Sequence, residues 1–289
     1  MSEDASTLAS LGRFLEIQTL GLNLPFALAF LFLAAGGLPS VEQFVLIVIA
    51  FVAARNAGHS FNRWADRDQD RQNPRTQGRA LVTGRFSPGF ALGFAYFNAV
   101  VVVVAAYFLS PLAFFLAPVA LVLIFLYSYT KRASSLTTAY LGLVEAIIPA
   151  AVYIAIQGTL PLPVWLAVAA MLCWGTAFET VHSLGDIESD RALGLRSLPL
   201  RIGVRRSALL VPTLHAVALV LLAGFGLALG LPWPYFVGLA LMAVIAGTSD
   251  VRFQRRPTEA RVPFQRHFLL GALYLAGVVI AVFVPVPAL

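Results

Sequence analysis

The sequence predicts an all-α, polytopic membrane protein. Hydrophobic side chains make up 59% of the 289 residues and charged side chains only 12%, which is about half the charged fraction of a water-soluble domain. The hydrophobic residues lie in long blocks separated by short polar stretches. These blocks are too long for the alternating strands of a membrane barrel, whereas about 20 consecutive apolar residues form one membrane-spanning helix. We therefore expect a bundle of helices and no sheet.

Polar residues, prolines and glycines divide the chain into nine expected transmembrane helices, all within one domain of residues 1–289. The first, second, third and seventh helices contain the apolar blocks at 26–35, 44–54, 97–107 and 214–229. The lone cysteine, Cys173, lies in the sixth helix and supports neither a disulfide framework nor a thiolate metal site. In chain order, the expected helices are residues 12–36, 41–65, 89–109, 111–129, 136–157, 163–185, 207–230, 233–249 and 265–285.

The basic residues predict how these helices are oriented. Of 20 lysine and arginine residues, 19 precede the first helix or follow helices 2, 4, 6 and 8, and Arg55 inside helix 2 is the exception. Basic residues gather on the cytoplasmic side of membrane proteins. We therefore expect a cytoplasmic N-terminus, a C-terminus on the opposite side, and cytoplasmic loops at 62–88, 186–206 and 250–265 that cap an active site. The net charge of +6 then suits the headgroups of a lipid bilayer and not a nucleic acid.

Two acidic clusters follow helix 2 and helix 6. Each cluster continues a polar stripe along one face of its helix, because the residues recur every three or four positions. Both helices run toward the cytoplasm, so both stripes end at the same surface. Asp68 and Glu188 fall off these faces, and we expect them to be exposed. The stripes are Arg55, His59, Asn62, Asp66 and Asp70 on helix 2, and Glu179, His182, Asp186 and Asp190 on helix 6.

Two facing carboxylate stripes are typical of a site for hard divalent cations. Mg²⁺ prefers oxygen ligands and is usually held by one or two protein carboxylates together with phosphate oxygens of a substrate. Two or three ions can therefore hold a diphosphate between the stripes, which four aspartates alone would repel. The other interpretation is a pair of solvated helix ends, with the aspartates in exposed salt bridges to Arg63, Arg67, Arg71 or Arg191.

The motifs resemble those of the UbiA-type superfamily of intramembrane prenyltransferases. Asn62, Asp66 and Asp70 match its NxxxDxxxD motif, and Asp186 and Asp190 match its DxxxD motif. The segments 73–81 and 194–199 resemble the stretches that follow the two motifs, and 127–132 resembles the short basic loop after helix 4. The resemblance covers nearly the whole chain.

The resemblance implies Mg²⁺-dependent transfer of a polyprenyl chain from a polyprenyl diphosphate to an aromatic acceptor such as 4-hydroxybenzoate, a reaction of quinone biosynthesis. The diphosphate would leave an allylic cation that substitutes the aromatic ring. The catalytic residues carried over, which would also ligate the metal, are Asp66, Asp70, Asp186 and Asp190, with Asn62 as a further metal ligand. The diphosphate would be bound by Asn62, Arg63, Arg67, Lys131 and Arg132, and the supporting residues would be Glu179 and His182.

Other interpretations remain open at this point. Helix 1 lacks an arginine before Pro25, and residues 24–28 look closer to superfamily members that prenylate naphthoates in menaquinone pathways. A non-aromatic acceptor is a further alternative. In different classes, the carboxylates would serve an ion-coupled transporter or a phosphatidyltransferase. Within the bundle, we expect Arg55 to pair with Glu179, while Glu145 either supports the site or partners another polar group.

Overall fold

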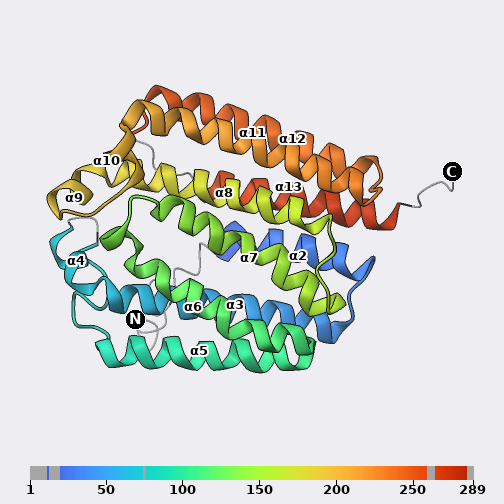
Figure 1. Ribbon diagram of the computed structural model, residues 1–289, viewed down its shortest axis with the longest axis horizontal. Helices are drawn as coiled ribbons and strands as arrows, with labels where there is room; N and C mark the ends of the chain where they lie inside the picture. Colours follow the sequence, from blue (N-terminus) through green and yellow to red (C-terminus); the bar gives the residue numbers. More distant parts are fainter. Residues whose placement is uncertain (1–11, 13–19, 74–75, 259–263, 285–289) are drawn as a thin grey trace, which may run out of the picture.

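The computed structural model describes residues 12, 20–73, 76–258 and 264–284. Within these residues, nine long helices lie side by side along the molecule and three short helices gather at one end (Figure 1). The described part of the chain contains no strand, so the all-α prediction is confirmed. The long helices are α2 (Leu20–Ala35), α3 (Val41–Ala65), α5 (Pro88–Leu109), α6 (Pro111–Ala133), α7 (Thr137–Gln157), α8 (Val164–Gly185), α11 (Val204–Ala228), α12 (Trp233–Arg255) and α13 (Phe264–Phe283). The short helices are α4 (Arg67–Gln72), α9 (Ile187–Ala192) and α10 (Leu198–Ile202).

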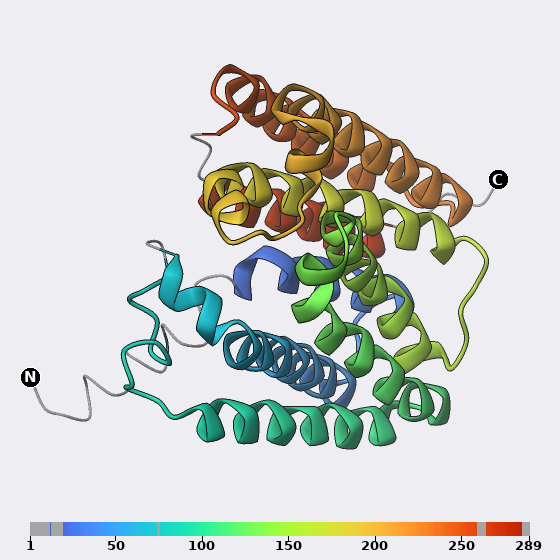
Figure 2. The ribbon, with the colours of Figure 1, turned by 60° about the vertical axis from the view of Figure 1, so that its left-hand side comes forward.

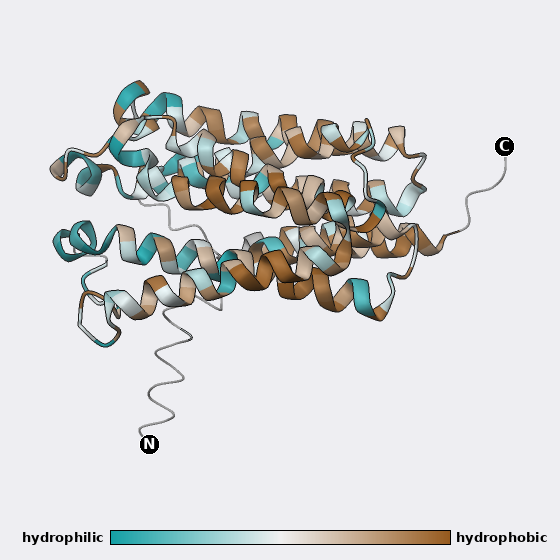
Figure 3. Ribbon diagram, turned by 60° about the horizontal axis from the view of Figure 1, so that its bottom comes forward, coloured by the Kyte–Doolittle hydropathy of each residue, from teal (hydrophilic) through white to brown (hydrophobic). Residues whose placement is uncertain are grey.

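The distribution of apolar residues matches an integral membrane protein. Hydrophilic residues gather at the end that holds the short helices, whereas the bodies of the long helices are hydrophobic (Figure 3). Large apolar side chains face outward, such as Phe97 at 65% exposure and Phe115 at 71%, as expected for a lipid-facing surface. In the described part of the chain, seven helices are long and apolar enough to cross a membrane, and two shorter apolar helical stretches are α2 and Phe268–Phe283 of α13.

Most helix boundaries lie within three residues of those predicted, but two helices continue further. Helix α6 ends at Ala133 instead of residue 129, and α12 ends at Arg255 instead of residue 249. Each last turn carries two basic residues, which interact favourably with the helix dipole and its unpaired carbonyl groups. The basic segment after the fourth expected helix is therefore the end of α6 and not a loop. Residues 13–19 of the first expected helix lie outside the described residues.

Local sequence signals explain where several helices begin and end. Ser40 forms a reciprocal capping box with Gln43 at the start of α3. Serines cap α5 and α6, each followed by a proline at the first helical position, where the missing N–H has no cost. Helix α7 ends at Gly158, whose left-handed φ of 69° favours glycine. The cytoplasmic loops predicted at 62–88 and 186–206 contain the short helices α4, α9 and α10.

The bundle has two sides of different character. Helices α11 and α12 lie on one side and α3 and α5 on the other (Figure 2). A core of aromatic and aliphatic side chains fills the space between α2, α8, α11, α12 and α13. Phe26 and Phe30 both pack against Tyr274, with ring centroids 5.5 and 5.9 Å apart. The buried apolar side chains are therefore concentrated on the side away from α3 and α5.

Glycines allow α7 and α8 to pack in close contact. A Cβ atom at Gly142 of α7 would clash with the hydroxyl of Thr176 and the backbone oxygen of Leu172 on α8. Backbone atoms cannot move aside cheaply, so this contact requires glycine. The contact fixes the position of α7 along α8. Both helices contribute to the site described below.

We expect Gly142→Ala to lower stability by roughly 1–3 kcal/mol, the usual cost of forcing an extra carbon into a packed interface. The measurement is the melting temperature of the purified protein in detergent. Gly93→Ala is the matched control, because Gly93 also lies within a helix and a Cβ there meets nothing within 4 Å. Equal melting temperatures for the two variants would contradict the close contact of α7 with α8.

Candidate active site

The two acidic motifs adopt the same local structure. In each, a long helix ends at the first aspartate, and a six-residue helix follows at once: α4 after Asp66 and α9 after Asp186. The two aspartates have nearly the same backbone angles, φ −94° and ψ 5° at Asp66 and φ −103° and ψ 6° at Asp186. The second aspartate of each motif donates its N–H to the first at 2.8 Å, so the helical spacing continues across the bend.

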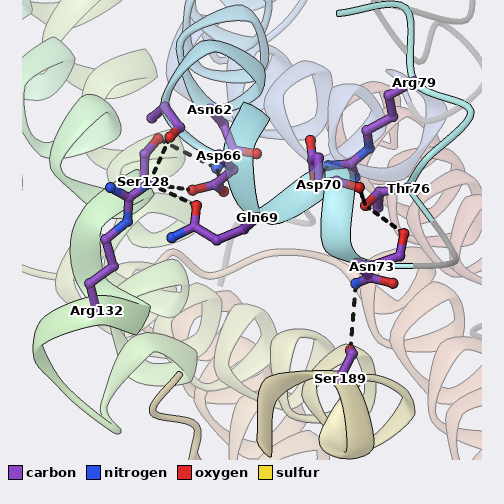
Figure 4. Close-up of polar contacts among 11 residues, drawn as sticks. Asn62, Asp66, Gln69, Asp70, Asn73, Thr76, Arg79, Ser128, Arg132 and Ser189 are labelled. Carbon is purple, nitrogen blue, oxygen red and sulfur yellow. Dashed lines mark hydrogen bonds and ion pairs between the residues drawn. The ribbon is translucent and has the colours of Figure 1, made fainter. Parts of the chain in front are cut away.

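The first motif is tied to neighbouring cations and amides (Figure 4). Asp66 Oδ2 accepts a hydrogen bond from Asn62 Nδ2 at 2.8 Å, and Asp66 Oδ1 accepts one from Arg132 Nη2 at 3.0 Å. Asp70 is buried and its Oδ1 lies 2.6 Å from Arg79 Nη1. Asp70 is therefore held in a polar interior, whereas Asp66 is partly exposed and is held by its two hydrogen bonds.

The second motif is paired with Lys131. Asp190 is 4% exposed, and its Oδ2 lies 3.6 Å from Lys131 Nζ without accepting a hydrogen bond. Glu179, two turns below Asp186, is also buried and accepts a hydrogen bond from the Tyr127 hydroxyl at 3.2 Å. Buried carboxylates of this kind need nearby positive charge, and Lys131 supplies it.

The last two turns of α6 join the two motifs. Lys131 interacts with the negative charges of Glu179 and of three motif aspartates, namely Asp186 and Asp190 of the second motif and Asp66 of the first. One residue further, Arg132 also donates to the backbone oxygen of Ala65 at 2.7 Å. A second link joins the two short helices, where Asn73 Nδ2 lies 3.5 Å from Ser189 Oγ (Figure 4). The expectation that both stripes end at one shared surface is confirmed.

Burial dominates the titration of these aspartates. Burial raises the pKa of Asp66, and Asp70 raises it further, while the hydrogen bond and charge of Arg132 act in the opposite direction. Burial likewise raises the pKa of Asp190, which Lys131 lowers and Asp186 raises. Placing several carboxylates together therefore opposes their ionisation, and added positive charge would favour the ionised form.

The donor set fits hard divalent cations bound together with a phosphate ligand. Among the residues that the structure describes, no three His, Cys, Asp or Glu side chains form a ready-made metal site. Mg²⁺ does not need one, since it commonly takes one or two carboxylates and completes its shell with water and phosphate oxygens. Asp190 Oδ2, buried and accepting no hydrogen bond, is an oxygen with capacity to take part in such a shell.

An elongated cavity of about 490 Å³ begins beside Asn62 and Tyr127. It lies between α2, α3, α5, α6 and α7, and its walls are mainly alanine, valine, leucine and isoleucine side chains. Its lining residues on α3 extend from Ile47 to Asn62, about 22 Å at the helical rise per residue. A long apolar molecule whose polar end lies at the aspartates would fit this space.

A polar cluster lies within the cavity, below the motifs. Asn23 Nδ2 donates to Glu145 Oε1 at 2.7 Å, and the positive charge of Arg55 acts on the same carboxylate. The expectation that Arg55 pairs with Glu179 is wrong, because Glu179 is held by Tyr127 and Lys131 instead. Spacing along α3 identifies the face on which Arg55 lies, but not which helix faces it.

The remaining residues predicted from the sequence lie on the helices that carry the two motifs. Arg63 is 5% exposed, and Arg67 at the start of α4 folds back on the end of α3, donating to the backbone oxygen of Trp64 at 2.7 Å. His182 is half-buried, with its ring 4.6 Å from that of Phe178. Asp68 and Glu188 are exposed, as expected.

Sequence reasoning missed several residues that hold the site together. Tyr127 and Ser128 lie four positions before Lys131 and Arg132, and this helical spacing places them on the same face of α6. Ser128 lies 3.5 Å from Asn62 Nδ2. Arg79 was recognisable only as one basic residue among many, since its partner Asp70 is nine positions away in a different local structure.

Comparison with known proteins places this architecture in a defined group. The sequence profile of the UbiA prenyltransferase family matches residues 23–270. A 4-hydroxybenzoate octaprenyltransferase from Cupriavidus necator is 34% identical, with 87% of this chain and 88% of that protein covered. The protein of the same name from Cupriavidus pinatubonensis is 33% identical, with 97% and 99% covered.

Solved structures give the same result for the fold. A UbiA homologue from Aeropyrum pernix K1, without ligand, superposes with a TM-score of 0.82 at 28% identity, covering 92% of this chain and 98% of that one. A UbiA homologue from Archaeoglobus fulgidus, bound to GPP and Mg²⁺, has a TM-score of 0.73 at 18% identity, covering 95% and 100%.

We expect Lys131→Met to lower the melting temperature by at least about 3 °C without Mg²⁺, because it leaves buried carboxylates uncompensated. Adding Mg²⁺ should stabilise the variant more than the wild-type protein, since the ion replaces the missing charge. Arg71→Met is the matched control, because Arg71 pairs with the exposed Asp68 at 3.6 Å and should matter little. Wild-type melting behaviour in Lys131→Met would show that the motifs do not depend on this cation.

Proposed function

Because the chain belongs to the UbiA prenyltransferase family, we propose that it transfers a polyprenyl chain from a polyprenyl diphosphate to an aromatic acceptor such as 4-hydroxybenzoate. The carrying observation is that Lys131 lies among carboxylates of both aspartate motifs, next to an elongated apolar cavity. One end of this arrangement suits a diphosphate with divalent cations, and the other suits a hydrocarbon tail. As a family member, the chain is a membrane prenyltransferase.

The two motifs are proposed to hold two or three Mg²⁺ ions. The ligands would be Asp66, Asp70, Asp186 and Asp190, with the Asn62 amide oxygen as a further metal ligand. When bound, Mg²⁺ supplies positive charge that stabilises the departing diphosphate. Glu179 and His182 would support this arrangement from the helix below the second motif.

The basic residues around the motifs are proposed to bind the diphosphate itself. Lys131 lies 3.6 Å from Asp190, and Arg132 lies 3.0 Å from Asp66. Divalent cations would take over the neutralisation of these aspartates, so that both basic side chains can turn to the diphosphate oxygens. Arg63, Arg67 and Asn62 lie close to the same helix end and would complete the binding site.

The cavity is proposed to receive the prenyl tail and to keep water away from the reacting carbon. The bond between the allylic carbon and the diphosphate oxygen breaks, and the diphosphate departs with the electron pair. The allylic carbon then forms a bond with a ring carbon of the acceptor, which loses a proton. Tyr127 and Phe51 are aromatic residues of this cavity lining, and an aromatic face beside a carbocation stabilises it.

Arg55 is proposed to bind the carboxylate of the acceptor. It lies in the cavity wall about two helical turns below Asn62, so an aromatic ring bound there would lie below the diphosphate. This position provides the basic group that helix 1 lacks before Pro25. The sequence of helix 1, residues 24–28, still favours a naphthoate as the alternative acceptor, and a naphthoate that carries a carboxylate would use the same arginine.

The membrane arrangement is proposed to include α2 and α13 as spans, which gives nine in all within one domain of residues 1–289. Support comes from their packing against each other inside the bundle. The short helices α4, α9 and α10, which carry or follow the motifs, would then lie on the cytoplasmic side with the N-terminus. The active site would open toward the cytoplasmic end of the bundle, and the C-terminus would lie on the other side.

The direct test is to incubate the protein, in lipid nanodiscs with Mg²⁺, with labelled geranyl, farnesyl and geranylgeranyl diphosphates and a panel of acceptors. We expect a product whose mass equals acceptor plus prenyl group, and none after chelation of Mg²⁺. Asp190→Asn should lower turnover by about 100-fold or more, whereas Glu188→Gln, on the exposed side of α9, should stay within about twofold of wild type. Full activity in Asp190→Asn, or in chelator, would refute the proposal.

A second prediction concerns the acceptor. Arg55→Gln should raise the KM for 4-hydroxybenzoate by roughly tenfold or more, because a buried carboxylate would lose its charged partner. The KM for the prenyl diphosphate should stay unchanged, since Arg55 lies away from the motifs. An equal rise in the KM for the uncharged 4-hydroxybenzamide would mean that Arg55 does not recognise the carboxylate.

A further inference from the structure

Glu145 is a carboxylate in the wall of the apolar cavity that the reaction described above does not use. It belongs to α7, opposite Arg55 of α3. Its Oε1 accepts a hydrogen bond from Asn23 of α2, whereas its Oε2 is buried and accepts none. A buried carboxylate oxygen without a donor is costly to keep, so its presence beside the acceptor pocket calls for a role.

The neighbouring helices hold this carboxylate in place. At Gly175 of α8, a Cβ atom would lie 2.7 Å from Glu145 Cγ and 2.9 Å from Glu145 Cβ. Any larger residue at Gly175 would displace the glutamate, so α8 leaves the space that the side chain occupies. Together with the hydrogen bond from Asn23, this packing fixes Glu145 between α2, α7 and α8.

The cavity holds one pair of oppositely charged residue types before any substrate binds. Among the lining residues that the structure describes, Arg55 is the one Lys or Arg and Glu145 is the one Asp or Glu, and the positive charge of Arg55 favours the ionised form of Glu145. The ionised Glu145 carboxylate compensates the guanidinium of Arg55. An acceptor carboxylate arriving at Arg55 would be a second anion for one cation, and like charges in a low-dielectric site repel strongly.

We propose that Glu145 is a specificity-determining residue that acts as the internal counter-ion of Arg55, which the carboxylate of the acceptor must displace. This inference rests on the proposed function, because it requires an acceptor bound at Arg55. Glu145 keeps the arginine paired while the cavity holds only the hydrocarbon tail. It also sets the affinity for charged acceptors: an aromatic carboxylate must compete with Glu145 for the guanidinium, whereas an uncharged phenol has no anion to place there and does not meet this competition.

The test compares wild type with Glu145→Gln in nanodiscs, using 4-hydroxybenzoate and its uncharged analogue 4-hydroxybenzamide as probes. Removing the competing charge should lower the KM for 4-hydroxybenzoate by roughly tenfold. The KM for 4-hydroxybenzamide and for the prenyl diphosphate should not change. An unchanged or higher KM for 4-hydroxybenzoate, or an equal gain for both acceptors, would overturn the proposal, because a merely structural role cannot distinguish the charge of the acceptor.

Thermal stability provides a readout that needs no turnover. Glu145→Gln leaves Arg55 without its counter-ion, so 4-hydroxybenzoate should raise the melting temperature of the variant more than that of wild type, and 4-hydroxybenzamide should not. A variant that folds only when purified with 4-hydroxybenzoate would support the proposal, and one that neither compound stabilises would refute it. Failure of wild type to form product would instead refute the proposed function, whatever the melting temperatures.

Discussion

The structure depends on one electrostatic constraint: several carboxylates lie together at one end of a hydrophobic bundle, and their charge must be compensated there. Lys131 and Arg132, in the last turn of α6, lie against aspartates of opposite motifs. Without these cations, burial of Asp66 and Asp190 would strongly favour their neutral forms. The same need for positive charge favours the binding of divalent cations. The charge compensation that stabilises the fold therefore also suits the site to metal binding.

The packed core and the cavity lie in different parts of the bundle. Aromatic side chains fill the interior between α2, α8, α11, α12 and α13, while the cavity lies between α2, α3, α5, α6 and α7. Helices α7 and α8 meet at glycine contacts along the boundary between these two regions. One acidic motif follows α3, at the cavity, and the other follows α8, in the packed half. A substrate bound at the motifs would therefore contact the tightly packed half of the bundle on one side and the cavity on the other.

Much of this arrangement follows from the sequence, and the exceptions have physical reasons. The helical spacing of the stripes was predictable because the bend at Asp66 and at Asp186 preserves the backbone hydrogen bond to the next aspartate. The end of α6 was placed too early, since basic residues resemble a loop signal but also stabilise a helix terminus. The predicted pairing of Arg55 with Glu179 is wrong, and the sequence does not predict the cavity, because both depend on which helices pack together. Periodicity along a single helix does not contain that information.

The central claim is that both motifs act on one ligand. A double-mutant cycle tests it most directly, measuring Mg²⁺-dependent binding of a labelled prenyl diphosphate to wild type, Asp66→Asn, Asp190→Asn and the double variant. Residues that share one bound group give strongly non-additive losses, whereas independent sites give losses that add. Our account predicts that the double variant binds little worse than either single variant. Free-energy losses that simply sum would contradict it.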